Sequence, residues 1–135
     1  MRFAMENDFN VIVSVGELNR GDFPEEIVSG FKKSVSGADI SKLDKLVVAY
    51  EPVWAIGTGE SDDPARANQI IGKLKQSAFK LFGADSGKIK FLYGGSVNSQ
   101  NAGGFLSQPN IDGALVGGAS LNSEEFSLIV GSYNS

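Results

Sequence analysis

The sequence predicts an α/β fold of four parallel βα units, organised as one domain over residues 1–135. Two observations predict it: short apolar runs alternate with helical stretches, and those runs are almost continuously apolar. Parallel strands buried on both faces have this continuous character, whereas half-exposed antiparallel strands alternate apolar and polar residues. A chain of 135 residues is long enough to bury one hydrophobic core.

The strands are expected where β-branched and aromatic residues gather in short runs. Four such runs occur, at residues 11–15, 46–50, 89–93 and 114–116. Each has the length of a strand and is separated from the next by helical periodicity or turn residues. The chain therefore reads as four consecutive βα units without a linker or repeat.

The clearest helix is expected between the second and third strands. Asp62 and Asp63 can cap its start, Pro64 suits its first turn, and Gly83 marks its end. Its apolar residues recur on one face: Ala67, Ile70, Ile71, Leu74, Ala78 and Leu81. A helix with one apolar face packs that face against a sheet.

Three further helices are expected, over residues 24–35, 99–106 and 124–130. The first carries apolar residues in line on one face. The second is a poorer helix because it contains Gly103 and Gly104, each of which costs about 1 kcal/mol relative to alanine. The third begins after Asn122 or Ser123, and either side chain can cap it.

Composition excludes several classes of function. Lys and Arg number 12 against 16 Asp and Glu, a net charge of −4 that argues against nucleic-acid binding. The absence of Cys excludes disulfides, thiolate metal sites and cysteine nucleophiles, and the absence of His removes any imidazole base or metal ligand. Neither a membrane-spanning run nor a signal peptide is recognisable. We therefore expect a soluble, cytoplasmic protein.

One carboxylate stands where chemistry is expected. Loops and helix starts converge at the carboxyl ends of parallel strands, and the second strand delivers Glu51 there, with Pro52 favouring an extended backbone. The apolar segment 53–59 contains two glycines and could swing over a ligand and expel water. Such exclusion would suit Glu51 to take a proton from carbon. Alternatively, Glu51 is a surface or salt-bridging carboxylate and Trp54 a core aromatic residue.

Glycines cluster after the third and fourth strands. The chain has 17 glycines, and pairs at Gly94 and Gly95 and at Gly117 and Gly118 directly follow apolar runs. Glycine permits close backbone approach, and N–H groups in such a loop form a concavity suited to phosphate. Ser96 adds a hydroxyl donor. Each pair alone is also explained by a tight turn after a strand.

These motifs together resemble the triosephosphate isomerase family. Residues 49–59 read AYEPVWAIGTG and resemble the family's active-site signature, which is highly specific. Residues 93–97, YGGSV, and 112–121, DGALVGGASL, resemble its phosphate-binding strand ends in the same order. Residues 13–17 resemble its fifth strand, with Ser14 where the family usually has Cys. The resemblance covers nearly the whole chain but only the C-terminal half of the family's enzyme, strands five to eight.

The resemblance implies roles for named residues. Glu51 would be the base that shuttles a proton between the carbons of dihydroxyacetone phosphate and glyceraldehyde 3-phosphate, a step of glycolysis and gluconeogenesis. Phosphate would bind N–H groups of Gly57, Ser96, Gly117 and Gly118. The lid would comprise Pro52, Val53, Trp54, Ala55, Ile56, Gly57, Thr58 and Gly59. Tyr93 would help to latch the closed lid, and Glu17 would support the site. No metal or organic cofactor is implied; the expected ligands are triose phosphate or inorganic phosphate or sulfate.

The sequence also departs from the family pattern. The family's base works with a neutral His and a Lys from its first four strands, and this sequence has no His. Three acids follow the lid, Glu60, Asp62 and Asp63, and are expected either to weaken phosphate binding or, for one Asp, to cap a helix. Lys75 stands where the family has an Arg that pairs with the residue represented by Asp112, so that contact should be looser.

The implied fold is half of a (β/α)8 TIM barrel, which usually needs about 250 residues. Its inner face and two sheet edges would meet water, so we expect completion by self-association, as a homodimer of half-barrels. A separate polypeptide supplying the first four strands is the competing prediction. The start of the chain resembles the tail of the helix before the family's fifth strand, which favours truncation of a longer gene.

Two functions remain open at this point. The first is a triosephosphate isomerase component, weak or inactive alone because it lacks the His and Lys. The second is a non-catalytic phosphate-binding or assembly module that retains ancestral site residues. Neither function involves nucleic acid or a membrane.

Overall fold

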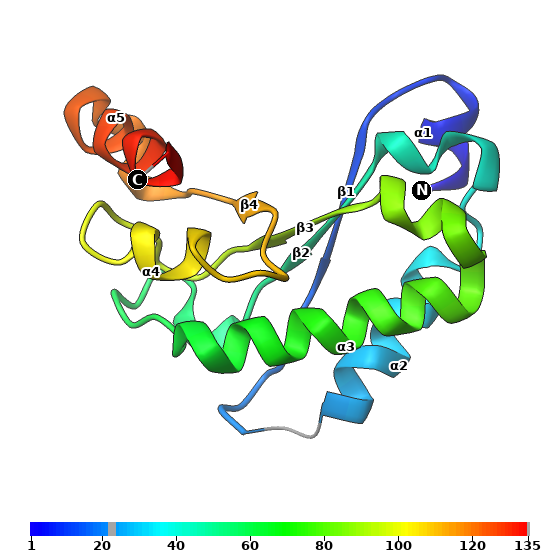
Figure 1. The fold of residues 1–135 in the computed structure, drawn as a ribbon, viewed down its shortest axis with the longest axis horizontal. Helices are drawn as coiled ribbons and strands as arrows, with labels where there is room; N and C mark the ends of the chain where they lie inside the picture. The colour runs from blue at the N-terminus through cyan, green and yellow to red at the C-terminus, as the bar shows by residue number, and fades with distance from the viewer. Residues whose placement is uncertain (22–23, 135) are drawn as a thin grey trace.

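A four-stranded parallel sheet forms the centre of the protein. The computed structural model describes residues 1–21 and 24–134. The strands are β1 (Val11–Val15), β2 (Leu46–Tyr50), β3 (Lys90–Tyr93) and β4 (Gly113–Ala114), and they lie side by side in chain order (Figure 1). All three strand pairs are parallel, so every carboxyl end reaches the same edge of the sheet. The predicted α/β fold of four βα units, half of a (β/α)8 barrel, is confirmed.

Helices follow the strands as expected. The α-helices are α1 (Arg2–Glu6), α2 (Pro24–Val35), α3 (Pro64–Phe82), α4 (Ala102–Leu106) and α5 (Ser123–Gly131). Short 3-10 turns occupy Ile40–Lys45, Val53–Ala55, Gly83–Lys88, Gly118–Leu121 and Ser132–Asn134. None of the helices in the described part of the chain is long and apolar enough to cross a membrane.

Helix α3 has the local signals that the sequence predicts. The Asp63 side chain caps it by accepting a hydrogen bond of 2.9 Å from the Arg66 N–H, and Pro64 occupies its first turn. The helix ends at Gly83, whose φ of 61° suits glycine. The predicted apolar face is buried from Ala67 to Ala78, but Leu81 on the last turn is 44% exposed, so the buried stripe ends one turn early.

The core lies between the sheet and the helices α2 and α3, which run along the same side of the strands (Figure 1). Phe31 of α2 meets Phe91 of β3 there with ring centroids 6.2 Å apart. The other side of the sheet is uncovered, and Ile12 of β1 is 54% exposed. Burial therefore alternates along β1 and β3. Their continuously apolar sequences are typical of strands buried on both faces, but in this chain only one face of the sheet is covered.

Several predicted boundaries are shifted. Strand β3 begins at Lys90, because Ile89 ends the preceding 3-10 turn. The fourth strand is Gly113–Ala114 instead of residues 114–116, and β3 is the neighbour with which it pairs. Helix α4 begins at residue 102 instead of 99, because the Asn98 side chain accepts hydrogen bonds from two N–H groups of the preceding turn. Helix α5 begins at Ser123 and is capped by Asn122.

Candidate functional site

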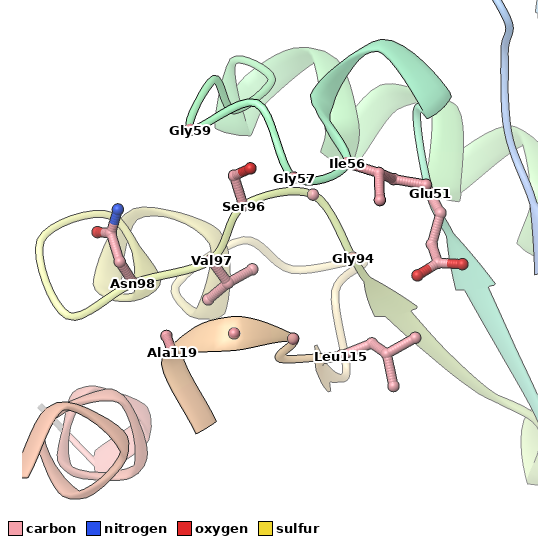
Figure 2. Close-up of a pocket in the computed structure, with 13 residues that line it drawn as sticks. Glu51, Ile56, Gly57, Gly59, Gly94, Ser96, Val97, Asn98, Leu115 and Ala119 are labelled. Carbon is pink, nitrogen blue, oxygen red and sulfur yellow. The ribbon is translucent and has the colours of Figure 1, made fainter. Parts of the chain in front are cut away.

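A cavity of about 310 Å³ lies at the carboxyl ends of β2, β3 and β4 (Figure 2). The Glu51 side chain stands on one side of it, and the loops after β3 and β4 form the other side. Seven of the predicted site and lid residues line it: Glu51, Ile56, Gly57, Gly59, Ser96, Gly117 and Gly118. Its size is at the lower end for a small-molecule site. The fold thus brings together residues that are up to 67 positions apart, from 51 to 118.

Backbone contacts fix the position of Glu51. Its N–H donates to the Val15 carbonyl at 2.8 Å, and the Gly94 N–H donates to the Tyr50 carbonyl at 2.9 Å, so the sheet ladders extend to the site. Gly16 is required beside it, because a Cβ there would lie 1.8 Å from the Glu51 carbonyl oxygen. On the other side, a Cβ at Gly94 would lie 3.0 Å from Glu51 Oε1. Two glycines therefore make room for this residue.

Ser96 is held in an unusual backbone conformation. Its φ is 49°, in the left-handed region that costs a non-glycine residue free energy and that clusters at functional sites. The Ser96 Oγ donates a hydrogen bond of 2.5 Å to the Ala55 carbonyl, and the Asn101 side chain donates to the Ser96 carbonyl at 3.0 Å. The loop after β3 is thereby tied to the segment after β2.

The loop after β4 brings two glycines to the cavity, between Leu115 and Ala119. Gly117 and Gly118 line the cavity, and neither has an atom within 4 Å of where a Cβ would lie. The Gly117 carbonyl accepts hydrogen bonds from the Ser120 N–H at 2.9 Å and from its hydroxyl at 2.7 Å. The loop therefore contains a tight turn, which was the alternative explanation of the glycine pair. The turn and a phosphate cradle are compatible, because the peptide groups that face the cavity carry no side chain.

The predicted lid is divided between buried and exposed residues. Pro52 and Ala55 are buried, and a 3-10 turn spans Val53–Ala55. Beyond Ile56 the chain is exposed, and Gly57 and Gly59 adopt positive φ angles of 70° and 81°. Pro52, Val53, Trp54, Ala55 and Thr58 do not line the cavity.

A buried polar cluster lies beneath the lid. Glu17 is only 2% exposed and accepts hydrogen bonds from Trp54 Nε1 at 2.8 Å and from Arg66 Nη2 at 2.7 Å. Burial disfavours the charged form of Glu17, but the hydrogen bonds from Arg66 and Trp54 outweigh it and hold its pKa below the ordinary value. Arg20 stacks on the other side, 4.9 Å from the Trp54 ring centroid. Glu17, for which the resemblance implies a supporting role, thus contacts Trp54 of the predicted lid.

Tyr93 lies next to the cavity without lining it. Its hydroxyl accepts a hydrogen bond of 2.8 Å from the Asp62 N–H and donates one of 3.0 Å to the Gly95 carbonyl. Burial raises the pKa of Tyr93 to about 12, so its hydroxyl keeps its proton at neutral pH. Tyr93 thus connects the end of the predicted lid with the loop after β3.

The three acids after the lid are not part of the cavity lining. Asp63 caps helix α3, and Asp62 is buried and forms an ion pair of 2.6 Å with Arg66. Glu60 is exposed, and none of the three lines the cavity. The capping explanation therefore holds for Asp63. The Lys75 contact with Asp112 also forms, as a single hydrogen bond of 3.0 Å.

Sequence reasoning missed six cavity residues as site residues: Gly94, Gly95, Val97, Asn98, Leu115 and Ala119. Gly94 and Gly95 had a signal, since they form the first glycine pair. Leu115 follows β4 at a position whose side chain points to the cavity (Figure 2). Within residues 1–21 and 24–134, no group of three or more acidic, His or Cys side chains is arranged to hold a metal ion.

Comparison with known proteins identifies the family. The family model described as triosephosphate isomerase matches residues 1–133. The triosephosphate isomerase of Caldanaerobacter subterraneus subsp. tengcongensis is 39% identical over 132 residues, which cover 94% of this chain and 53% of that enzyme. That of Nocardia farcinica is 40% identical over 131 residues, 93% of this chain and 50% of that enzyme. That of Dictyoglomus thermophilum is 45% identical over 115 residues, 84% of this chain and 46% of that enzyme.

The fold and the rim cavity define half of a (β/α)8 barrel with a cavity at the carboxyl ends of its strands. The match over residues 1–133 shows that the chain belongs to the triosephosphate isomerase family. The chain spans about half the length of the curated relatives that it matches.

Proposed function

We propose that this chain supplies the phosphate-binding and proton-transfer part of a triosephosphate isomerase site. The observation that carries the proposal is the shared cavity, in which the Glu51 side chain faces glycine-rich loops from two neighbouring strands. Backbone N–H groups of Gly57, Ser96, Gly117 and Gly118 suit a phosphate, and a carboxylate across from them suits proton removal from carbon. The ligand class is a three-carbon sugar phosphate, with inorganic phosphate or sulfate as a simpler occupant.

The proton transfer follows from this arrangement. The Glu51 carboxylate takes a proton from the hydroxyl-bearing carbon next to the carbonyl of dihydroxyacetone phosphate and returns it to the former carbonyl carbon. A second proton leaves the hydroxyl oxygen and is replaced on the former carbonyl oxygen, so that the ketone becomes the aldehyde. Between the two steps the substrate oxygen carries negative charge, which needs a positioned donor. The sequence holds no His that could be that donor. One such donor is worth about 2.7 to 4 kcal/mol, so the chain by itself should isomerise at least a hundredfold more slowly than a complete site.

Titration with a phosphorylated enediolate analogue tests the proposal. We expect binding to the wild-type chain and to Glu51→Gln, and slow isomerisation in a coupled assay that Glu51→Gln removes. Glu60→Gln is the matched control, because Glu60 is an exposed acid of the same segment that does not line the cavity. No binding of the analogue would contradict the proposal and favour the assembly module. Isomerisation unchanged in Glu51→Gln would exclude this residue as the base.

We further propose that a second copy of the chain covers the open face of the sheet. Large apolar residues are exposed in the first and in the last part of the chain. They are Phe3, Phe9 and Ile12 near the N-terminus, and Phe126, Leu128 and Val130 near the C-terminus. A twofold axis along the strands would place β1 of one chain beside β4 of the other in parallel. Two copies would then provide the eight strands of a closed barrel.

Sedimentation velocity on the purified chain tests the second copy. We expect a dimer that Ile12→Lys converts to a monomer, because Ile12 lies on the uncovered face. Lys33→Glu in α2, which exchanges one exposed charge on the covered side, should leave the dimer intact. A folded wild-type monomer would contradict the proposal. A complex that forms only with a polypeptide carrying the other four strands would support the competing arrangement.

A further inference from the structure

Asp62 is a buried carboxylate directly after the predicted lid. The residue is 3% exposed, and a carboxylate so removed from water needs partners. Its Oδ2 accepts hydrogen bonds from Arg66 Nη1 at 2.6 Å and from the Tyr50 hydroxyl at 3.1 Å. Its backbone N–H donates to the Tyr93 hydroxyl at 2.8 Å. Both the side chain and the backbone of Asp62 are therefore anchored.

The same guanidinium also reaches the first half of the lid. Arg66 Nη2 binds Glu17 Oε2 at 2.7 Å, and Glu17 Oε1 accepts from Trp54 Nε1 at 2.8 Å. The two arms of Arg66 thus hold two carboxylates, one linked to Trp54 and the other next to the end of the lid. The Tyr50 hydroxyl lies between the carboxylates, 3.3 Å from Glu17 Oε1.

The geometry of Arg66 couples these contacts. A guanidinium is a rigid plane, so the carboxylate that holds one arm also orients the other arm. Without the Asp62 carboxylate, Arg66 Nη1 would keep only the Tyr50 hydroxyl as a partner, at 3.3 Å. This hydrogen bond is longer, and its acceptor carries no charge. Arg66 is the residue that could then turn, since its side chain is 28% exposed while both carboxylates are fully buried. A turned Arg66 would no longer hold Glu17 where Trp54 meets it.

We propose that Asp62 is a positioning residue that sets the location of Trp54, and with it the lid, through Arg66 and Glu17. The proposal rests on the proposed function only in that the segment 52–59 is the lid of a binding site. The coupling itself is a property of the chain without any ligand. Removing the Asp62 carboxylate should free Trp54, although the two side chains share no hydrogen bond in this cluster.

The adjacent acid provides the control. Asp63 is one residue away, but its side chain accepts a hydrogen bond from the Arg66 backbone N–H as the cap of helix α3, and the guanidinium binds Asp62 and Glu17 instead. Asp63→Asn keeps a good capping residue and removes the same charge. A change seen in Asp62→Asn and not in Asp63→Asn therefore cannot come from net charge near the lid.

The experiment uses fluorescence, because Trp54 is the only Trp in the sequence. Acrylamide quenching is measured for the ligand-free full chain and for Asp62→Asn, Asp62→Ala and Asp63→Asn, with circular dichroism as the check of folding. We expect the Asp62 variants to raise the quenching constant about twofold, as for a partly buried side chain that becomes accessible, and Asp63→Asn to leave it unchanged.

Two results would overturn the proposal. Folded Asp62 variants with the quenching constant of the wild type would show that Asp62 is only a structural residue. If neither Asp62→Asn nor Asp62→Ala folded, the role would lie in the fold and not in the lid. The two proposals can fail separately. If the enediolate analogue does not bind but the Asp62 variants change Trp54 quenching, the proposed function is wrong and the coupling of Asp62 to Trp54 still holds.

Discussion

The two sides of the candidate site are built differently. On the β2 side, backbone hydrogen bonds fix Glu51, and a cluster of side chains centred on Arg66 of α3 connects Glu17, Tyr50 and Asp62 beside the lid. On the β4 side, the cavity wall follows a strand of two residues and includes Gly117 and Gly118, and α5 beyond it exposes Leu128 to 60%. The side for which we propose proton transfer is therefore tied by many contacts within the chain, whereas the side for which we propose phosphate binding lies next to the uncovered edge of the sheet.

The largest effect is expected at Gly16, on the rigid side. Gly16→Ala places a Cβ 1.8 Å from the Glu51 carbonyl oxygen and 2.6 Å from its carbonyl carbon, so backbone must move. We expect a loss of at least about 3 kcal/mol in the free energy of unfolding, at the upper end for overpacking. Urea denaturation measures it.

The control for Gly16→Ala is a glycine with free space. Gly30→Ala lies within α2 with nothing inside 4 Å of the new Cβ, and should raise the free energy of unfolding by about 0.5 to 1 kcal/mol. Equal effects of the two variants would show that the β1 to β2 junction is not as tightly packed as its contacts indicate.

Arg66→Met tests whether the cluster stabilises the fold. The variant leaves Glu17 and Asp62 buried without their cation, which usually costs 3 to 5 kcal/mol, but Arg66 is 28% exposed and water can enter. We expect a loss of about 2 kcal/mol by urea denaturation. Arg20→Met, which removes an exposed cation from the Trp54 ring, should change stability by less than about 0.5 kcal/mol. A similar loss in both variants would contradict a special role for the cluster.

The pH dependence of stability sharpens the assignment to Glu17. Because its pKa in the folded protein is lowered from 4.5, its contribution is complete above that value and is lost as the pH falls through the folded-state pKa. The stability difference between wild type and Glu17→Gln should therefore shrink as the pH falls below 4.5, measured by urea denaturation. Exposed acids such as Asp8 contribute equally to the pH dependence of stability in wild type and Glu17→Gln, so their contribution cancels in the difference. A difference that stays constant would show that Glu17 is not the group that titrates.

Local signals predicted most of the fold. Strands β1 and β2 and helix α2 have the predicted limits, and Asp63, Pro64 and Gly83 bound α3 as expected, because these signals act within a few residues. The short β4 could not be predicted, since the length of a strand depends on its neighbours. The described sheet has a partner for β4 on one side only.

The site was predictable where it rests on motif residues. Glu51 and the glycine loops meet because parallel strands end at one edge of a sheet. The buried ion pair of Asp62 with Arg66, in contrast, could not be predicted. From the sequence, Asp62 is equally well explained as an exposed acid or as a helix cap. Its burial depends on Tyr50 and Tyr93 from two strands, which no local pattern specifies.

The smallest effect is expected at the far contact of α3, between Lys75 and Asp112. Lys75 Nζ donates to Asp112 Oδ1 at 3.0 Å, while Oδ2 already accepts from the Phe91 N–H at 2.7 Å. Lys75→Arg offers a planar fork, but one carboxylate oxygen is shared with the backbone, so the gain should be only about 0.5 kcal/mol. Lys73→Arg, whose partner Glu25 is 4.0 Å away and exposed, should change nothing in the same urea titration. A loss of stability in Lys75→Arg would mean that the space beside Asp112 fits the narrower ammonium group. The replacement of the family's Arg by Lys75 would then be compensated within this chain.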